Sequence, residues 1–268
     1  MSSNLRHIIT VLVVAGIAIL LSVYAWHWIE RGQTRPTAVL PTPEATISPV
    51  ATGLPSPTPD EMVEKRHEMV KLIEDYGIKD ENVLRAVEAV PRERFVLPKY
   101  VNQAYADHAL PIGYGQTISQ PSLVAMMTEL LRLRSDSGVL EIGTGSGYQA
   151  AILAELVQEV YTVEIVEELC VQAKERLTDL GYDNIQIKHG DGYYGWEEHA
   201  PYDAIIVTCA PDHIPQPLVK QLADGGHMVI PVGPPGAYQV LWLVTREGKE
   251  IKSEGVKGVV FVPLTGEH

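Results

Sequence analysis

The sequence has little cysteine and no group of side chains spaced to hold a metal. Cys170 and Cys209 are the two cysteines of 268 residues, one in a helix-like and one in a strand-like segment. Two isolated cysteines provide neither a disulfide framework nor a cysteine metal site, so we expect two buried free thiols. No metal-spaced histidine cluster accompanies them, and we expect no metal.

The chain also lacks a surplus of positive charge. Lys and Arg number 21 against 34 Asp and Glu, which gives a formal net charge of -13. Acidic and basic side chains balance over residues 1–60, so the surplus falls on residues 61–268. Phosphate neutralisation dominates the affinity of proteins for nucleic acid. We therefore expect no nucleic-acid partner.

A long apolar run is present near the N-terminus. Residues 8–29 carry no formal charge, and a helix of that length spans about 33 Å, enough for a bilayer core. A cleavable signal peptide is the alternative, with a small-residue site near Ala25. We favour an uncleaved transmembrane anchor over residues 1–31, because the run continues through Trp26 and Trp28, which are typical of membrane interfaces.

A Pro/Thr-rich segment follows at residues 32–59, where Arg35 and Glu44 carry the formal charges. This composition cannot bury a core and predicts an extended linker with a reach of roughly 87 Å at about 3.1 Å per residue. Basic residues lie on both sides of the apolar run, so the sequence does not fix its orientation.

From residue 60 the pattern is that of a folded domain that begins with helices. Asp60 is the expected N-cap of the first helix, and Gly77 its C-terminal stop. A second helix is expected over residues 80–90. A third is expected over residues 122–133, with Pro121 suited to its first position.

Beyond residue 137 strands and helices alternate, which predicts an α/β domain with a parallel, doubly wound sheet. The expected strands are 138–142, 159–164, 184–188, 203–208 and 226–232. The expected helices are 148–156, 167–180 and 215–223, with mostly loop over 189–202. Two antiparallel strands are expected at the end, over 239–245 and 259–262, with a turn at 247–249 between them.

The stretch Val139–Tyr148 joins the first of these strands to the next helix through Gly143, Gly145 and Gly147. Glycine tolerates positive φ and has no Cβ, so backbone can pass close to a ligand. The helix that follows leaves its first amides free to donate. The stretch therefore predicts a cradle for a nucleotide-type cofactor.

Acidic residues end the next two strands. Glu164 can accept from ribose hydroxyls, and Asp191 can accept from an adenine amino group. Ligands of open parallel sheets bind beyond the carboxyl ends of the strands, where all these residues fall. Either acid alone is weak evidence, because solvated strand ends and Asp-Gly turns are common, but their order and spacing favour a shared site.

A dinucleotide site is the main rival. It requires Gly-x-Gly-x-x-Gly, whereas Tyr148 stands here where that motif has its third glycine. Glu141 lies two positions before the first of the three glycines and would repel a pyrophosphate. An acid suits a ligand that carries an ammonium and a sulfonium, so the sequence favours S-adenosylmethionine over NAD.

The loop over residues 109–121 is rich in glycine and small polar groups and lies directly before the helix at 122–133. One interpretation is that it reaches over the bound cofactor. The other is a structural loop in which Ser119 caps that helix. Spacing alone leaves both open.

At this point the chain resembles the protein-L-isoaspartate O-methyltransferase family, over roughly residues 60–268. The residues that carry the resemblance are Ala109–Gly113, Gln116–Pro121, Val139–Gln149, His189–Gly192, Ala200–Thr208, Gln221-Leu222, Gly225-Gly226, Pro231–Gly233 and Phe261–Leu264. The resemblance implies a Rossmann-like class I methyltransferase sheet. It also implies methyl transfer from S-adenosylmethionine to the α-carboxylate of L-isoaspartyl residues in damaged proteins, which initiates their repair.

The resemblance implies roles for individual residues as well. Ser119 would be the active-site serine. The implied cofactor contacts are Thr117, Ile118, Glu141, Gly143, Thr144, Gly145, Gly147, Tyr148, Glu164, Asp191, Gly192 and Thr265. The implied substrate contacts are Ile112, Ser119, Gln120, Val262 and Leu264. Two departures concern the edge of the pocket: Val124 stands where the family has a polar contact, and a contact found further along the tail of some members has no counterpart before His268.

Other readings stay open at this level. A methyltransferase for another carboxylate would share the cofactor residues, and a tethered, non-catalytic cofactor-binding protein would share the anchor and linker. We expect a monomer held at the membrane by residues 8–29. Because S-adenosylmethionine is a cytoplasmic metabolite, we expect the catalytic domain in the cytoplasm, and the tether leaves the outer side as an alternative.

Overall fold

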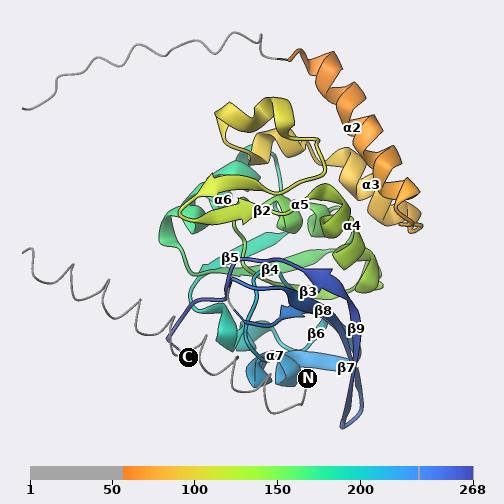
Figure 1. Cartoon of the computed structure of the whole chain (residues 1–268). Coiled ribbons are helices and arrows are strands. Elements are labelled where there is room, and N and C mark those ends of the chain that lie inside the picture. The colour runs from red at the N-terminus through yellow and green to blue at the C-terminus, as the bar shows by residue number, and fades with distance from the viewer. Residues whose placement is uncertain (1–56, 235, 268) are drawn as a thin grey trace, which may run out of the picture. The chain divides into compact units, whose positions relative to one another are not determined.

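The computed structural model describes residues 57–234 and 236–267 (Figure 1). The anchor expected at residues 8–29 and nearly all of the linker at 32–59 lie outside the described residues. Within the described part of the chain, no helix has both the length and the apolar character needed to cross a bilayer.

The domain begins with two helices, α2 (Pro59–Asp75) and α3 (Glu81–Ala89). Thr58, not the expected Asp60, is the N-cap of α2. Its hydroxyl accepts from the amide of Glu61 at 3.3 Å, and the Glu61 carboxylate accepts from the Thr58 amide at 2.6 Å. This reciprocal pair satisfies two amides at once, which a cap at Asp60 would not do.

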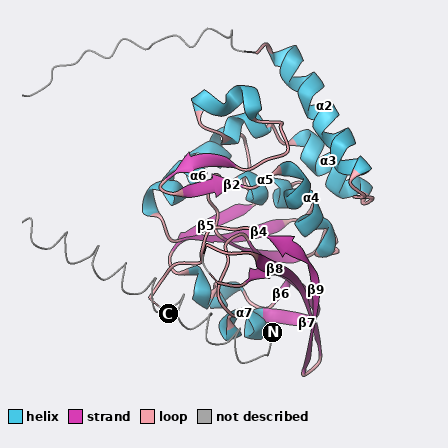
Figure 2. Ribbon diagram, in the orientation of Figure 1, coloured by secondary structure: helices cyan, strands magenta, loops and turns pink. Residues whose placement is uncertain are grey.

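Seven strands form the main sheet, with helices packed on both of its faces (Figure 2). The first five strands are parallel and the last two antiparallel, in the order β5-β4-β3-β6-β7-β8-β9. The strands are β3 (Gly138–Ile142), β4 (Glu159–Glu164), β5 (Ile185–His189), β6 (Tyr202–Val207), β7 (Leu222–Val232), β8 (Gln239–Glu247) and β9 (Glu250–Val259). The predicted doubly wound sheet with an antiparallel end and an N-terminal helical extension is confirmed.

Strand alternation separates two layers of core. Val139 of β3 belongs to a cluster that includes buried residues of α2, α3, α4 (Pro121–Leu130), α5 (Tyr148–Ala154) and α6 (Glu167–Asp179). The next residue, Leu140, belongs to a second cluster with α7 (Gln216–Gln221). Successive side chains of a strand point to opposite faces, so a buried parallel strand is apolar at nearly every position.

Several predicted boundaries were wrong. β7 begins at Leu222, inside the helix expected over 215–223. β9 spans Glu250–Val259, whereas a strand was expected at 259–262. The turn places Gly248 at φ 60 and sets Glu247 opposite Glu250, so the returning strand pairs at once. β9 lies at the edge of the sheet and is exposed along nearly its whole length.

The segment between α3 and β3 is more ordered than expected. It contains the short 3-10 helices η1 (Arg92–Phe95) and η2 (Pro98–Gln103) and a hairpin of β1 (Leu110–Gly113) and β2 (Gln116–Ile118). The third helix ends at Leu130 and not at 133, because the chain turns at Arg132 with φ 52. The expected loop over 189–202 holds two 3-10 turns, η3 (Gly192–Tyr194) and η4 (Glu197–His199).

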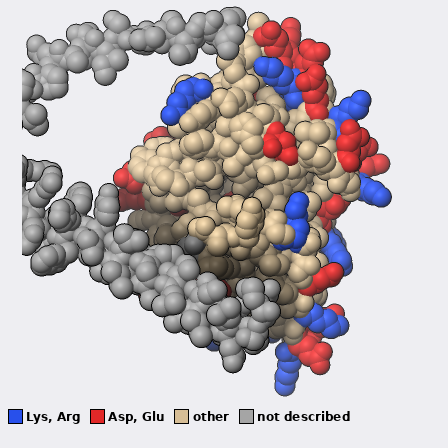
Figure 3. Space-filling model, viewed as in Figure 1, with Lys and Arg blue, Asp and Glu red and all other residues tan. Residues whose placement is uncertain are grey.

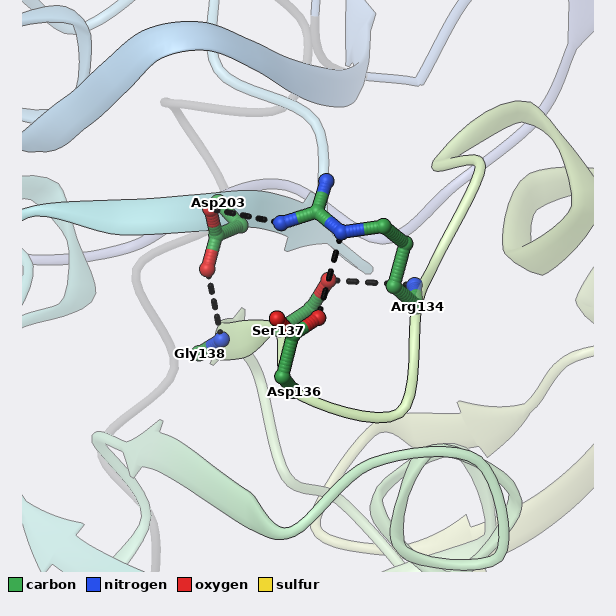
Figure 4. A network of polar contacts seen from close by, with 5 residues as sticks. All are labelled: Arg134, Asp136, Ser137, Gly138 and Asp203. Carbon is green, nitrogen blue, oxygen red and sulfur yellow. Dashed lines mark hydrogen bonds and ion pairs between the residues drawn. The ribbon is translucent and has the colours of Figure 1, made fainter.

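A polar network fixes the amino ends of two central strands (Figure 4). The Asp203 carboxylate accepts from the Gly138 amide at 2.9 Å and lies 3.7 Å from an Arg134 nitrogen. Arg134 also donates through Nε to Asp136 at 3.1 Å. These contacts join the amino ends of the parallel strands β3 and β6. The carboxyl ends of both strands lie together on the opposite side of the sheet.

Candidate active site

The glycine stretch forms the loop between β3 and α5, with φ values of 95, 54 and 88 degrees at Gly143, Gly145 and Gly147. Gly143 is required for space as well as for conformation, because a Cβ there would lie 2.5 Å from Thr208 Oγ1. Thr208 follows β6 and donates to the Gly143 carbonyl at 2.7 Å. The loop is therefore held against the end of the neighbouring strand.

Glu164 ends β4 and is 5% exposed. One carboxylate oxygen accepts from the Gly145 amide at 2.7 Å, and the other accepts from the Val166 amide at 2.9 Å. A carboxylate offers about four acceptor positions. Glu164 is thus held in one orientation and keeps capacity for two ligand hydroxyls.

Glu141 lies on β3 and is fully buried. Its Oε2 accepts from the Thr162 hydroxyl at 2.5 Å, whereas its Oε1 has no hydrogen-bond partner. Burial raises the pKa of this carboxyl to about 8, a rise that the Thr162 hydrogen bond opposes and the nearby Glu164 increases. A buried acid with an unpaired oxygen is stabilised by a cation, so this position favours a ligand with a positive group.

Asp191 follows β5. It accepts from the Tyr193 amide at 2.9 Å and from the Glu267 amide at 3.1 Å. The C-terminal segment packs closely here, since a Cβ on Gly266 would lie 2.1 Å from an Asp191 oxygen. The expected adenine acceptor is therefore in contact with the end of the described chain.

Two adjoining cavities lie at the carboxyl ends of the strands, and both include Gly143, Gly145, Thr117 and Thr208 in their walls. The first, about 50 Å³, is also lined by Gln116, Ile142, Val163, Glu164, Ile165, Gly192, Cys209, Val262, Pro263, Leu264 and Thr265. The second, about 40 Å³, is also lined by Ile118, Ser119, Val124, Met127, Glu141, Thr144, Ser146, Tyr148, Gln149 and Phe261. Each cavity taken alone is smaller than the about 300–1,000 Å³ that is usual for ligand pockets.

Ser119 lies between β2 and α4 and lines the second cavity. It does not cap α4, because the N-cap is Gln120 and the carboxylate of Asp107 accepts from the Ser122 amide at 2.9 Å. No described residue is hydrogen-bonded to the Ser119 hydroxyl. The capping interpretation was therefore wrong, and Ser119 lines the cavity without capping the helix.

Four predicted site residues line neither cavity. Ile112 is buried, with its Cδ1 3.3 Å from the Cβ position of Gly145. Gln120 donates to Asp107 at 3.2 Å. Gly147 packs against α6, where a Cβ would meet Leu177 at 3.1 Å. Asp191, the fourth, adjoins Gly192 of the first cavity. The other predicted residues line one cavity or both, and all the assigned roles stay predictions.

Sequence reasoning missed several residues of the cavity walls, among them Gln116, Thr208, Cys209 and Phe261. Thr208 was recoverable, since it is the last residue of a predicted central strand. The two cysteines are free and buried as predicted, and burial raises the pKa of the Cys209 thiol. Charged side chains of both signs gather over α2 and α3 in the view of Figure 3.

Residues 64–268 match the family model described as protein-L-isoaspartate(D-aspartate) O-methyltransferase. A protein-L-isoaspartate O-methyltransferase of Dictyoglomus thermophilum is 55% identical over 204 residues, which cover 76% of this chain and 92% of that protein. One from Picosynechococcus is 58% identical over 208 residues, covering 77% and 93%.

Solved structures agree with the fold. A protein-L-isoaspartate O-methyltransferase structure superposes with a TM-score of 0.70 at 31% identity and covers 75% of this chain and 66% of that one. A Plasmodium falciparum structure described as a protein-L-isoaspartate O-methyltransferase in complex with S-adenosyl-L-homocysteine has a TM-score of 0.65 at 27% identity. The match covers 75% of this chain and 98% of that one.

Proposed function

The chain belongs to the protein-L-isoaspartate(D-aspartate) O-methyltransferase family, and we propose on that basis that it methylates the α-carboxylate of L-isoaspartyl residues in damaged proteins. The methyl donor is S-adenosylmethionine, and the ester formed initiates repair. Within the site, the main support for the proposal is that Glu141 has a buried oxygen without a hydrogen-bond partner and lines the same cavity as Ser119.

The side chains of the site suit this cofactor. When bound, S-adenosylmethionine supplies an electrophilic methyl group attached to a sulfonium. In this proposal Glu141 contacts its ammonium group, Glu164 the ribose, and Asp191 with Gly192 the adenine. The remaining proposed contacts are Thr117, Ile118, Gly143, Thr144, Gly145, Gly147, Tyr148 and Thr265.

Ser119 is the proposed contact to the substrate carboxylate. Its hydroxyl can donate to that carboxylate, and it precedes the first turn of α4, whose amino end attracts negative charge. Local donors of this kind matter because the chain carries a formal net charge of -13. Ile112, Gln120, Val262 and Leu264 are the proposed surroundings of the isoaspartyl residue.

The residues need not include a strong general base. A carboxylate is already ionised at neutral pH, so no proton has to leave it before it is methylated. Holding the reacting groups together in the right orientation contributes roughly 7–11 kcal/mol in favourable cases. The work of the chain is therefore to bind, to orient and to exclude water.

The proposal is tested with two synthetic peptides that differ at one residue, L-isoaspartyl in one and L-aspartyl in the other. The full chain is incubated with each peptide and methyl-labelled cofactor, and base-labile methyl ester is counted. We expect ester on the isoaspartyl peptide alone. Equal labelling of both peptides would exclude the repair activity, and cofactor binding without labelling would support a non-catalytic binding protein.

A finer proposal concerns location. We propose that residues 8–29 anchor the domain to a membrane through the Pro/Thr-rich segment, on the ground of their length and lack of charge. Fractionation of cells that produce the full chain and a chain starting at residue 57 should place only the first with membranes. Protease accessibility in spheroplasts then reports the side, and recovery of the full chain in the soluble fraction would refute the anchor.

A further inference from the structure

Arg92 is a fully buried cation in η1. None of the ion pairs among the described residues involves it, and its Nη1 has no hydrogen-bond partner. Burial lowers the pKa of the guanidinium, yet arginine keeps its charge in proteins. A buried charge without a carboxylate partner is destabilising unless its surroundings compensate for the lost water, so the contacts that surround Arg92 have to be considered.

The contacts of Arg92 converge on the candidate active site. Its Nη2 donates to the Ser119 carbonyl at 2.6 Å, and its Nε donates to the Ala104 carbonyl at 2.7 Å. Its guanidinium also lies 4.7 Å from the centre of the Tyr148 ring. Ser119 and Tyr148 stand in the same cavity wall, although they lie 29 positions apart in sequence. Residues 116–122, which include Ser119, are called the serine segment below. Arg92 therefore joins the serine segment to Tyr148, the first residue of α5.

The positive charge is placed where the proposed reaction needs it. The substrate group is a carboxylate, and the domain around it is strongly acidic. Exposed cations would be screened by solvent, whereas a buried one acts through a low dielectric. Arginine also offers a planar fork that contacts two carbonyls at once, which the single ammonium of lysine cannot reproduce.

We propose that Arg92 is a positioning residue for methyl transfer, which fixes Ser119 against the glycine-loop helix and favours the anionic substrate through its buried charge. The inference rests on the proposed function. Arg92 acts through the Ser119 carbonyl and Tyr148 and does not itself contact the reacting atoms.

Arg66 provides a matched control. Its side chain is 16% exposed, its Nε donates to the Tyr105 hydroxyl at 3.0 Å, and its Nη1 donates to the Glu88 carbonyl at 3.2 Å. It differs in having a carboxylate partner, Glu93, at 3.8 Å, and in lying outside both cavity walls. Loss of Arg66 removes a packed arginine of the same domain without touching the serine segment.

The experiment compares Arg92→Lys, Arg92→Met and Arg66→Met in the full chain, by thermal unfolding, cofactor Kd and the kcat and KM for the isoaspartyl peptide. We expect Arg92→Met to lose at least 30-fold in kcat/KM while cofactor Kd changes less than threefold. Arg92→Lys should recover most of the KM, because it restores the charge, but not the kcat, because it lacks the fork. Should Arg92→Met not fold, the kcat of Arg92→Lys decides alone.

Hydrogen exchange of residues 116–122 is measured on the same proteins and does not depend on activity. Exchange should be faster in both Arg92 variants and unchanged in Arg66→Met. Unchanged exchange, or a kcat/KM loss equal in Arg92→Met and Arg66→Met, would overturn the inference. A wild-type chain inactive on the isoaspartyl peptide would refute the proposed function, while the exchange data would still report whether Arg92 holds the serine segment.

Discussion

The backbone amide of Gly145 donates to the carboxylate of Glu164 at 2.7 Å. The glycine loop after β3 is thereby bound to the end of β4, and the side chain proposed to hold the ribose also holds the loop that surrounds the cofactor. This one hydrogen bond therefore positions both the glycine loop and the Glu164 side chain. Hydrogen bonds to charged groups contribute about 1.5–3 kcal/mol to stability.

Glu164→Gln should weaken cofactor binding. The amide side chain keeps the shape but loses the charge and one acceptor oxygen, so we expect a Kd roughly 10- to 100-fold higher, since each 1.4 kcal/mol is about tenfold. Calorimetric titration with S-adenosyl-L-homocysteine measures it. Glu167→Gln, an exposed acid in the first turn of α6, is the control, and equal affinities in the two variants would contradict the role of Glu164.

Gly143→Ala should reduce both stability and cofactor binding. Alanine at φ 95 is strained, and its Cβ would also lie 2.5 Å from Thr208 Oγ1. Gly181→Ala reproduces the strain without the clash, because Gly181 has φ 85 with nothing within 4 Å of its Cβ position. Strain in this region costs about 1–3 kcal/mol. We expect both variants to lower Tm and only Gly143→Ala to abolish binding; similar binding in both would mean that space at Gly143 is immaterial.

Cofactor affinity should rise with pH through Glu141. Its pKa in the free protein is raised from 4.5 to about 8, so it is mostly protonated at pH 6, while a bound cation favours the ionised form. Affinity should therefore increase between pH 6 and 8 and level off above, by at most about tenfold per pH unit. Glu141→Gln should bind more weakly and with a flat profile over this range. A flat profile in the wild-type chain would contradict this.

The raised pKa of Glu141 also predicts how the free energy of unfolding of the ligand-free protein changes with pH. A raised pKa in the folded state gives a contribution that is complete below the ordinary value of 4.5 and is lost as pH rises through about 8. Denaturant unfolding at pH 5 and pH 8 should show this loss in the wild-type chain and a smaller one in Glu141→Gln. Equal losses would place the raised pKa elsewhere.

Ser119→Ala should lower turnover without weakening cofactor binding. The variant loses one donor to an anionic substrate, worth about 1.5–3 kcal/mol, so we expect kcat/KM for the isoaspartyl peptide to fall roughly 10- to 100-fold. Cofactor Kd should stay within twofold. Ser135→Ala, on an exposed loop, controls for the substitution itself. A collapse of cofactor affinity with turnover preserved would show that Ser119 serves the cofactor instead.

The local parts of the site could be predicted from the sequence. The strand, glycine turn and helix around Gly145 form one continuous stretch, and Glu164 ends the following strand, so spacing alone indicated their meeting. The resemblance then supplied Ser119. The preference for S-adenosylmethionine followed from Glu141, an acid two positions before the first glycine, and from Tyr148 in place of a third dinucleotide glycine.

Contacts between distant segments could not be predicted in the same way. Ser119 looked like a helix cap because the true capping group, Asp107, comes from a loop 15 positions before Ser122. Thr208 meets Gly143 across neighbouring strands, 65 positions apart. The sequence gives no sign that Arg92 is buried, because its contact with the Ser119 carbonyl joins residues that lie 27 positions apart.

The charged edge of the sheet has a consequence for an enzyme that handles damaged proteins. Such substrates expose unpaired strands, which add readily to a free sheet edge. β9 presents Glu250, Lys252, Glu254 and Lys257 along its exposed length, and charged side chains of both signs disfavour that kind of pairing. The enzyme can thus meet misfolded chains repeatedly without becoming the template on which they aggregate.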